Sequence, residues 1–168
     1  MDTAKVYIGL SNPKTPTNVG AVMRAAGCFL ADAVFYTGDR YKTAAQFNTD
    51  TQNAATMIPL TSVDCLQDNI PENAQVVCVE LVEGATPLPE FQHPEKAFYI
   101  FGPEDGSIKQ AVVNRADAVV YIPAKGSLNL AQTVNVVLYD RMAKAGFARV
   151  SDDLIREARD ANNKLKCR

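Results

Sequence analysis

Residues 12–24 form the first segment whose residue types and spacing could do chemistry. They make a proline-containing loop that leads into a predicted helix, and a helix N-terminus can hold an anion because its first backbone N–H groups are unpaired. Asn18 and Arg24 are about 600° of helical rotation apart and share no stripe, but a long arginine can reach back toward the loop. The same residues also fit a helix that Thr17 or Asn18 merely caps, with Arg24 as a surface charge.

Residues 98–108 end a predicted buried strand in a turn with two glycines, a proline and two acids. Gly102 comes directly after the strand and would let a ligand approach the main chain closely. A carboxylate at Glu104 or Asp105 could orient a hydroxyl or an amine of that ligand. The alternative is an ordinary β-turn in which one of these acids caps the following helix.

Residues 120–130 lead from the last predicted strand into the longest predicted helix. Ser127 is a natural N-cap residue, so we expect it to begin that helix. Asn129 falls in the first turn, where its amide would face either a ligand or the solvent. Because α/β folds collect their ligands at strand ends and helix starts, the three segments are candidates for one site.

Strand-like and helix-like runs alternate along the chain and position these segments. The strand-like runs are short and rich in β-branched and aromatic residues: 5–10, 33–37, 75–81, 97–102 and 118–123. They are continuously apolar, as strands buried on both faces of a parallel sheet are. Helical patterns occupy residues 18–30, 62–69, 108–115 and 127–145. The sequence therefore predicts an α/β domain with a mostly parallel sheet and helices on both faces.

Three further segments have other patterns. Residues 39–56 are polar and should form a long surface loop that could hold a helical turn, and residues 82–94 should be irregular because they contain three prolines. Residues 152–166 carry spaced apolar side chains amid charges, which predicts an amphipathic helix. Either its own domain or a partner subunit could supply the surface on which this helix packs. We therefore divide the chain into a body, residues 1–150, and a C-terminal helical segment, residues 151–168.

The composition is that of an ordinary globular domain, with 47% apolar and 21% charged residues. The apolar runs are far shorter than the ~20 residues that span a bilayer, and no secretory signal pattern opens the chain, so we expect a cytoplasmic protein. The cysteines are scattered and His93 is the only histidine, so we expect no metal site and no disulfide. Cys28 and Cys78 lie in apolar runs and should be buried, inert thiols.

The net charge argues against nucleic-acid binding, whereas the distribution of charge along the chain allows it. A net charge of −2 and a pI near 5.4 argue against it, because phosphate neutralisation normally needs a basic face. The charge is uneven, however, since acids dominate the middle of the chain and bases its C-terminal end. Arg40, Tyr41 and Lys42 could contact a phosphate and stack on a base, or could belong to a plain exposed loop.

Taken together and in this order, the three segments resemble the signature motifs of the SpoU branch of the SPOUT superfamily, the trefoil-knot RNA ribose methyltransferases. The matching residues are Asn18-Val19-Gly20-Ala21-Val22-Met23-Arg24, Gly102-Pro103-Glu104, and Ile122-Pro123 with Ser127-Leu128-Asn129. Their spacing fits across nearly the whole chain. Two departures are a short spacer between Pro123 and Ser127, and Ser107 where a glycine is usual.

The resemblance implies an S-adenosylmethionine-dependent RNA (ribose-2′-O)-methyltransferase that needs no metal. It also implies a deep C-terminal trefoil knot whose loops hold the cofactor, and a homodimer that brings Arg24 near the reaction. By position, it assigns catalysis and orientation to Arg24, Asn18, Glu104, Ser127 and Asn129. By the same carry-over, it assigns cofactor binding to Leu81, Gly102, Pro103, Ile122 and Leu128.

The resemblance leaves the RNA substrate more open. We expect no separate RNA-binding domain before or after the body, as in the smallest tRNA-modifying members, and therefore prefer tRNA over rRNA. A non-catalytic RNA-binding or ribosome-assembly factor with the same fold is the alternative, and the acidic pI and the short third-motif spacer favour it. A Rossmann-type nucleotide-binding domain is disfavoured because no Gly-x-Gly-x-x-Gly follows the first strand.

Overall fold

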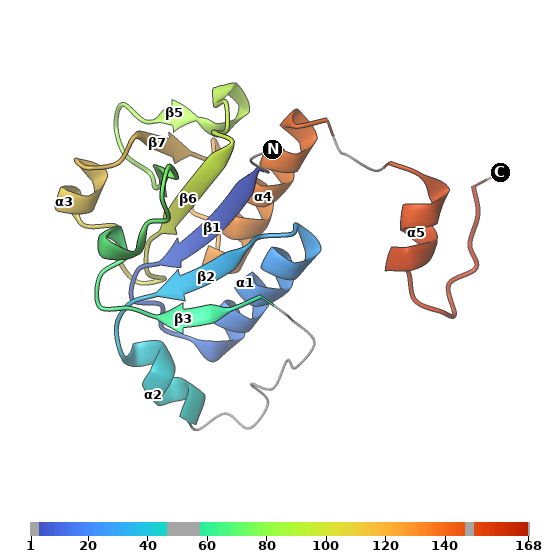
Figure 1. The fold of residues 1–168 in the computed structure, drawn as a ribbon, viewed down its shortest axis with the longest axis horizontal. Coiled ribbons are helices and arrows are strands. Elements are labelled where there is room, and N and C mark those ends of the chain that lie inside the picture. Colours follow the sequence, from blue (N-terminus) through green and yellow to red (C-terminus); the bar gives the residue numbers. More distant parts are fainter. Residues whose placement is uncertain (1–3, 47–57, 147–149, 168) are drawn as a thin grey trace.

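A parallel sheet forms the centre of the molecule (Figure 1). The computed structural model describes residues 4–46, 58–146 and 150–167, and within them seven strands lie in the order β3-β2-β1-β6-β4-β7-β5. All neighbouring strands in this sheet pair in parallel. The strands are β1 (Lys5–Leu10), β2 (Ala33–Tyr36), β3 (Leu60–Ser62), β4 (Gln75–Val79), β5 (Thr86–Pro87), β6 (Lys96–Phe101) and β7 (Ala118–Tyr121). The predicted α/β class with a parallel sheet is confirmed.

Helices cover the two faces of the sheet unequally. They are α1 (Pro16–Cys28), α2 (Arg40–Gln46), α3 (Gln110–Val113), α4 (Leu130–Lys144) and α5 (Asp152–Ala158), with 3₁₀ turns η1 (Gln67–Asn69) and η2 (Leu88–Glu90). The long helices α1 and α4 pack against each other over one face. The other face is covered by α3 and by the residues around η1. Helix α5 stands clear of the body (Figure 1).

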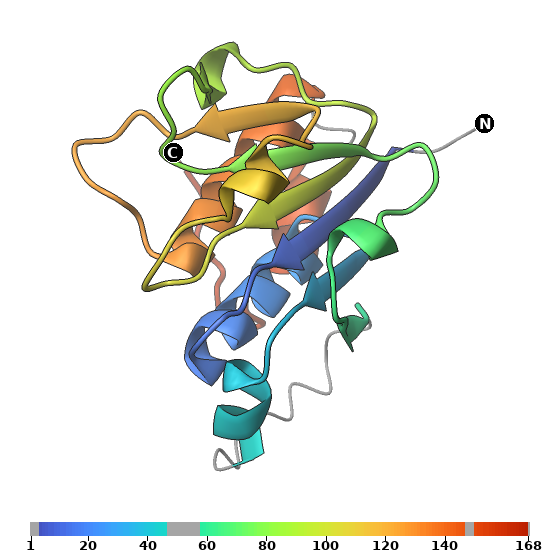
Figure 2. The same cartoon turned by 90° about the vertical axis from the view of Figure 1, so that its left-hand side faces the viewer.

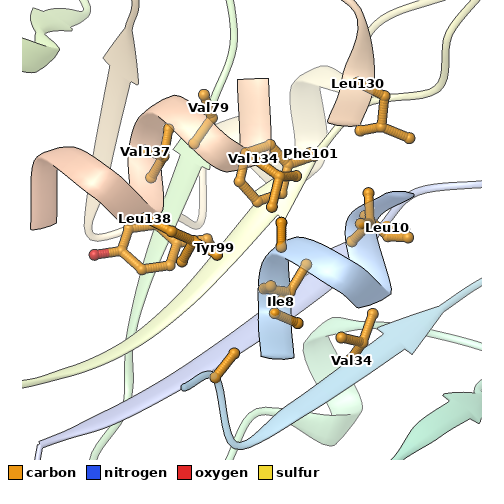
Figure 3. Close-up of a cluster of buried hydrophobic side chains, with 14 of the residues drawn as sticks. Ile8, Leu10, Val34, Val79, Tyr99, Phe101, Leu130, Val134, Val137 and Leu138 are labelled. Carbon is orange, nitrogen blue, oxygen red and sulfur yellow. The ribbon is translucent and has the colours of Figure 1, made fainter. Parts of the chain in front are cut away.

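The alternation of side chains along the buried strands creates two apolar layers. In β6, Tyr99 and Phe101 point toward α1 and α4, whereas Phe98 and Ile100 point to the opposite face. Figure 3 shows the larger layer, in which Val134 and its neighbours on α4 meet the strand side chains. Burial of each such side chain contributes about 1.5–3 kcal/mol, so the strands are anchored on both faces.

A polar cluster lies between β6 and α4 and contains the single histidine. The His93 side chain is only 5% exposed, with Nδ1 2.6 Å from the Tyr99 hydroxyl and Nε2 2.8 Å from Asp140 Oδ2. Arg141 Nη1 donates to the Tyr99 hydroxyl at 3.1 Å. The hydroxyl therefore has its proton free to donate to His93 Nδ1, which leaves the Nε2–H to donate to Asp140. Burial lowers the pKa of His93 and outweighs the opposing effect of Asp140.

Two cationic side chains of α4 hold the connection between β4 and β6 against this helix. Arg141 donates to the carbonyls of Pro94 and Glu95 at 2.6 and 2.7 Å, and Lys144 Nζ donates to the Phe91 carbonyl at 2.9 Å. This connection was expected to be irregular. It contains β5 and η2, and its backbone carbonyls are satisfied by side chains of α4 rather than by the sheet alone.

Several predicted element boundaries were wrong for local reasons. The helix expected over residues 62–69 is only the η1 turn, because Ser62 ends β3 and the Val63 N–H still donates to the Tyr36 carbonyl. The helix expected over residues 108–115 shrinks to α3, because the Ile108 N–H donates to Glu80 Oε2 and the backbone of Lys109 is extended.

The C-terminal helix and the polar loop also differ from expectation. Helix α5 ends at Ala158 rather than near residue 166, and beyond it Asn163 Oδ1 accepts a hydrogen bond from the Leu165 N–H, a local bond that competes with a helix. In the expected loop 39–56, α2 takes up residues 40–46, while residues 47–56 lie outside the described part. Cys78 is buried, and burial raises its pKa to about 12, but Cys28 is exposed at the end of α1. Within the described residues, no helix is long and apolar enough to cross a bilayer.

The pH dependence of stability should report on His93. Because its pKa is lowered by folding, the unfolded chain binds more protons, so the free energy of unfolding should fall as pH drops below the ordinary value of 6.5. In His93→Gln, whose amide can still donate to Asp140, this part of the pH dependence should disappear. Urea unfolding of both proteins between about pH 5 and pH 7 measures the difference. Parallel curves for the two proteins would contradict this.

Candidate active site

A cavity of about 420 Å³ opens at the carboxyl ends of β4, β6 and β7. This is where parallel α/β sheets bind ligands, and the volume suits a small organic molecule. Besides Asn18 of α1, the cavity is lined by three stretches: Val79–Leu81, Phe101–Glu104 with Gly106, and Tyr121–Ile122 with Gly126–Leu130 and Thr133. Figure 2 shows the wide loop between β7 and α4 that carries part of the third stretch.

The Glu80 carboxylate joins the end of β4 to the segment that follows β6. Its Oε1 accepts a hydrogen bond from the Leu81 N–H at 2.9 Å, and its Oε2 accepts one from the Ile108 N–H at 3.0 Å. A Cβ atom at Gly102 would lie 3.1 Å from Glu80 Oε2 and 3.2 Å from the Ile108 nitrogen. A side chain at position 102 would therefore require Glu80 or the Ile108 backbone to move by a few tenths of an ångström. Sequence reasoning missed Glu80, although an acid directly after a buried strand could have marked it.

Glu104 joins the turn after β6 to the start of α1. Its carboxylate accepts hydrogen bonds from the Lys14 N–H at 2.9 Å, the Thr15 N–H at 3.2 Å and the Asn18 Nδ2 amide at 3.0 Å. Partial burial would raise the pKa of Glu104, but these hydrogen bonds outweigh it and hold the pKa below its ordinary value. Glu104 therefore does not cap the helix that follows it, as one alternative had it. Glu104 instead supplies hydrogen-bond acceptors at the start of α1. This helix begins at Pro16, and its N-cap residue, Thr15, makes no side-chain capping hydrogen bond.

Asn18 and Asn129 continue this network to the other wall of the cavity. Asn129 Nδ2 donates to Asn18 Oδ1 at 3.1 Å, and Asn129 Oδ1 accepts from the Ala131 N–H at 2.9 Å. These bonds fix the orientation of both amides, because Asn18 must donate to Glu104 while accepting from Asn129. Asn129 is thus the N-cap of α4, and the expectation that Ser127 caps it is wrong. Ser127 lies in the preceding loop and lines the cavity.

All predicted site residues except Arg24 line this cavity. Arg24 is exposed on α1, and within the described part of the chain its side chain makes no hydrogen bond or ion pair. The structure also adds lining residues that were not among the predicted site residues, such as Tyr121 and Thr133. Tyr121 sits at the end of β7, and Thr133 lies one turn into α4.

The chemistry of the lining suits an organic ligand better than an ion. The carboxylates of Glu80 and Glu104 are occupied by hydrogen bonds of the chain itself, and no group of potential metal ligands occurs among the described residues. The remaining lining combines exposed apolar side chains, Leu81 and Leu128, with the backbone of glycine-bearing turns. Such a cavity can hold a molecule by apolar contact and main-chain hydrogen bonds.

The sequence matches the model of the SpoU rRNA Methylase family over residues 5–139, which includes all three lining stretches. The chain belongs to this family. No curated protein matches its sequence. Its similarity to solved SpoU structures lies below 25% identity, so these structures support the fold and carry no further conclusion by themselves.

Three solved structures illustrate the similarity of this SpoU family chain. One is the SpoU methyltransferase AviRb from Streptomyces viridochromogenes in complex with AdoMet: TM-score 0.74, 18% identity, covering 89% of this chain and 61% of that one. A second is the A. aeolicus TrmH/SpoU tRNA modifying enzyme: TM-score 0.70, 19% identity, covering 92% and 85%. A third comes from work on the 2-OH methylation of C/U34 on tRNA: TM-score 0.71, 22% identity, covering 86% and 93%. The chain thus spans only about three fifths of AviRb.

Replacing Glu104 by glutamine should destabilise the fold and deform the cavity. The amide keeps only one acceptor oxygen, so its NH2 group would face either the Lys14 N–H or the Thr15 N–H, and that group would lose its acceptor. We expect a loss of about 1–3 kcal/mol in the free energy of unfolding, measured by urea titration. Glu83→Gln is the matched control because Glu83 is exposed and has no partner within the described residues. Equal stability of the two variants would contradict the role of Glu104.

Proposed function

We propose that the chain is an S-adenosylmethionine-dependent RNA (ribose-2′-O)-methyltransferase. The observation that carries this proposal is the convergence of the three motif segments on one cavity at the carboxyl edge of the sheet. Membership of the SpoU rRNA Methylase family and the similarity to AviRb, whose structure contains AdoMet, support it.

The cavity fits this cofactor in both size and lining. Leu81, Ile122 and Leu128 provide apolar surface for an adenine ring and a thioether chain, while Gly102 and Pro103 bring the main chain of the turn to the cavity wall. When bound, S-adenosylmethionine supplies an electrophilic methyl group. Ser127 and Asn129, just before α4, are placed to orient the ligand. The hydrogen bonds from Glu104 through Asn18 to Asn129 fix this part of the cavity wall.

Arg24 is the residue that we assign to the reaction with RNA. A ribose hydroxyl is a poor nucleophile until its proton is withdrawn, and a guanidinium is a poor base by itself because it stays protonated. Arg24 therefore acts together with an RNA phosphate, which it binds while it orients the ribose hydroxyl, and the hydroxyl proton passes to solvent as the methyl group is transferred. Because Arg24 does not line the cavity of its own chain, we place it at the cavity of a partner subunit in a homodimer.

Other features are consistent with a homodimer. Leu154 and Ile155 on α5 are 41% and 56% exposed, so this helix presents apolar side chains on its surface. We assign residues 1–150 to the methyltransferase body and residues 151–168 to a C-terminal segment at or near this interface. Family membership also leads us to propose the deep C-terminal trefoil knot and a cytoplasmic location.

Transfer RNA is the substrate that we prefer over rRNA. Two similar structures are described by their tRNA modification, and the match covers 85% and 93% of their lengths, against 61% for AviRb. The rival proposal is an RNA-binding factor that has lost turnover, which the pI of 5.4 favours. Binding of RNA without binding of S-adenosylmethionine would support the rival.

Arg24→Ala should separate cofactor binding from methyl transfer. Because we assign Arg24 to the RNA and not to the cofactor, the variant should bind S-adenosylhomocysteine as the wild type does in calorimetry, while transfer of a labelled methyl group to tRNA falls by about 100-fold or more. Arg115→Ala, which removes another exposed arginine just before β7, serves as the control and should stay active. Full activity of Arg24→Ala would remove Arg24 from the mechanism.

Mixed dimers should show whether Arg24 acts across the subunit interface. Leu128→Trp should block the cavity of its own chain but keep Arg24, and Arg24→Ala should keep the cavity. If Arg24 acts on the partner's cavity, mixing the two inactive variants should restore part of the methyl transfer, because one intact cavity then faces one intact arginine. Light scattering checks that the mixture is dimeric, and a dimeric mixture without activity would place Arg24 in its own subunit's site or outside the mechanism.

A further inference from the structure

Arg40, the first residue of α2, lies over the seam between the loop after β1 and the turn after β6. Its Nη1 donates to both carboxylate oxygens of Asp105, at 3.0 and 2.8 Å, and its Nη2 donates to the Asn12 carbonyl at 2.6 Å. Its side chain is 34% exposed, and its Nε is buried. A planar guanidinium presents its donors in a fixed fork, so it can hold two such acceptors in one geometry.

This contact lies beside the Glu104 network and joins the same two segments. Glu104 bonds to Lys14 and Thr15, while the next residue, Asp105, bonds to Arg40. The seam is therefore closed at two adjacent points, first by Glu104 on the cavity side and then by Arg40 outside it. Movement of Asp105 away from the loop would pull on Glu104, because the two residues are neighbours in the chain.

The positions of Arg40 and Asn12 are themselves fixed. Tyr41 packs edge-on against Tyr36 of β2, with ring centroids 5.0 Å apart, which anchors the start of α2. Asn12 has a φ of 47°, and its N–H donates to Thr37 Oγ1 at 3.0 Å. Gly38 follows at a φ of 80°, where an added Cβ atom would lie 2.2 Å from Asn12 Oδ1. Arg40 thus holds Asp105 from a rigid base.

We propose that Arg40 is a positioning residue for the cofactor cavity: by joining Asp105 to the Asn12 carbonyl, it holds Glu104 against the start of α1. Through Glu104, it keeps the side chains of Asn18 and Asn129 in the orientation in which they line the cavity. This inference rests on the proposed function for the identity of the ligand, but the mechanical link concerns the chain alone.

The competing role for Arg40 is direct contact with an RNA phosphate, which the sequence left open for the cluster around residues 40–42. In the structure, the guanidinium is already bonded to a carboxylate and a carbonyl, and the Tyr41 ring packs on Tyr36. Release of Arg40 to a phosphate would leave the more distant Lys14 ammonium, at 3.7 Å, as the cationic partner of Asp105 among the described residues. The contacts therefore favour positioning over RNA binding.

The experiment compares Arg40→Ala, Asp105→Asn and the double variant with wild type, with Lys42→Ala as the control on the same helix. Affinity for S-adenosylhomocysteine is measured by calorimetry, affinity for tRNA by filter binding, and exchange of the Lys14 and Thr15 amide hydrogens by NMR. Both single variants should bind S-adenosylhomocysteine about 3- to 10-fold more weakly, and the double variant no more weakly than the worse single one. Both should also exchange the two amides faster, while Lys42→Ala matches wild type in S-adenosylhomocysteine affinity and in amide exchange.

The opposite pattern would overturn the proposal. If Arg40 contacts RNA, Arg40→Ala should weaken tRNA binding and leave S-adenosylhomocysteine binding and amide exchange unchanged, while Asp105→Asn should not weaken tRNA binding. If wild type itself fails to bind S-adenosylhomocysteine, the proposed function fails. Amide exchange then decides separately whether Arg40 holds the seam, and unchanged exchange in both single variants would reject this role. Asp105→Asn keeps the test valid should Arg40→Ala prove unstable.

Discussion

The Glu104 carboxylate supplies the acceptors that the start of helix α1 lacks. The Lys14 and Thr15 N–H groups precede the first turn, where no helical carbonyl can reach them, and Glu104 arrives from the turn after β6, 90 and 89 residues away in sequence. A charged acceptor at this end of a helix is also favoured by the helix dipole. One carboxylate therefore joins β6, α1 and, through Asn18 and Asn129, the start of α4.

The elements with a long, regular hydrophobic pattern could be predicted from the sequence, and the shortest elements could not. The strand β1 was predicted to the residue because its apolar run is bounded by polar residues, and α4 was recognised from the spacing of its buried face. The short strands β3 and β5 were missed because three or two residues carry too little pattern, and both depend on pairing with a neighbour. Likewise, α3 is one turn long because the Ile108 N–H donates to the Glu80 carboxylate, a tertiary contact that no local sequence pattern predicts.

The site was predicted by resemblance to motifs, and the structure shows why local reasoning could not have completed it. Capping rules favoured Ser127, yet Asn129 caps α4 because it must also meet Asn18, 111 residues away. Gly102 was expected to make room for a ligand, and it also makes room for Glu80. Arg40 and Asp105 have no visible relation in the sequence, since their pairing arises only when α2 and the turn after β6 are brought together.

The order of the strands has a consequence for the newly made chain. The central strand β6 pairs with β1 on one side and β4 on the other, and the cavity closes only when the loop before α4 arrives. During synthesis on the ribosome, the first hundred residues can collapse into part of a sheet but cannot yet present a complete binding surface. The newly made chain therefore cannot hold a ligand in this cavity before its C-terminal third has left the ribosome.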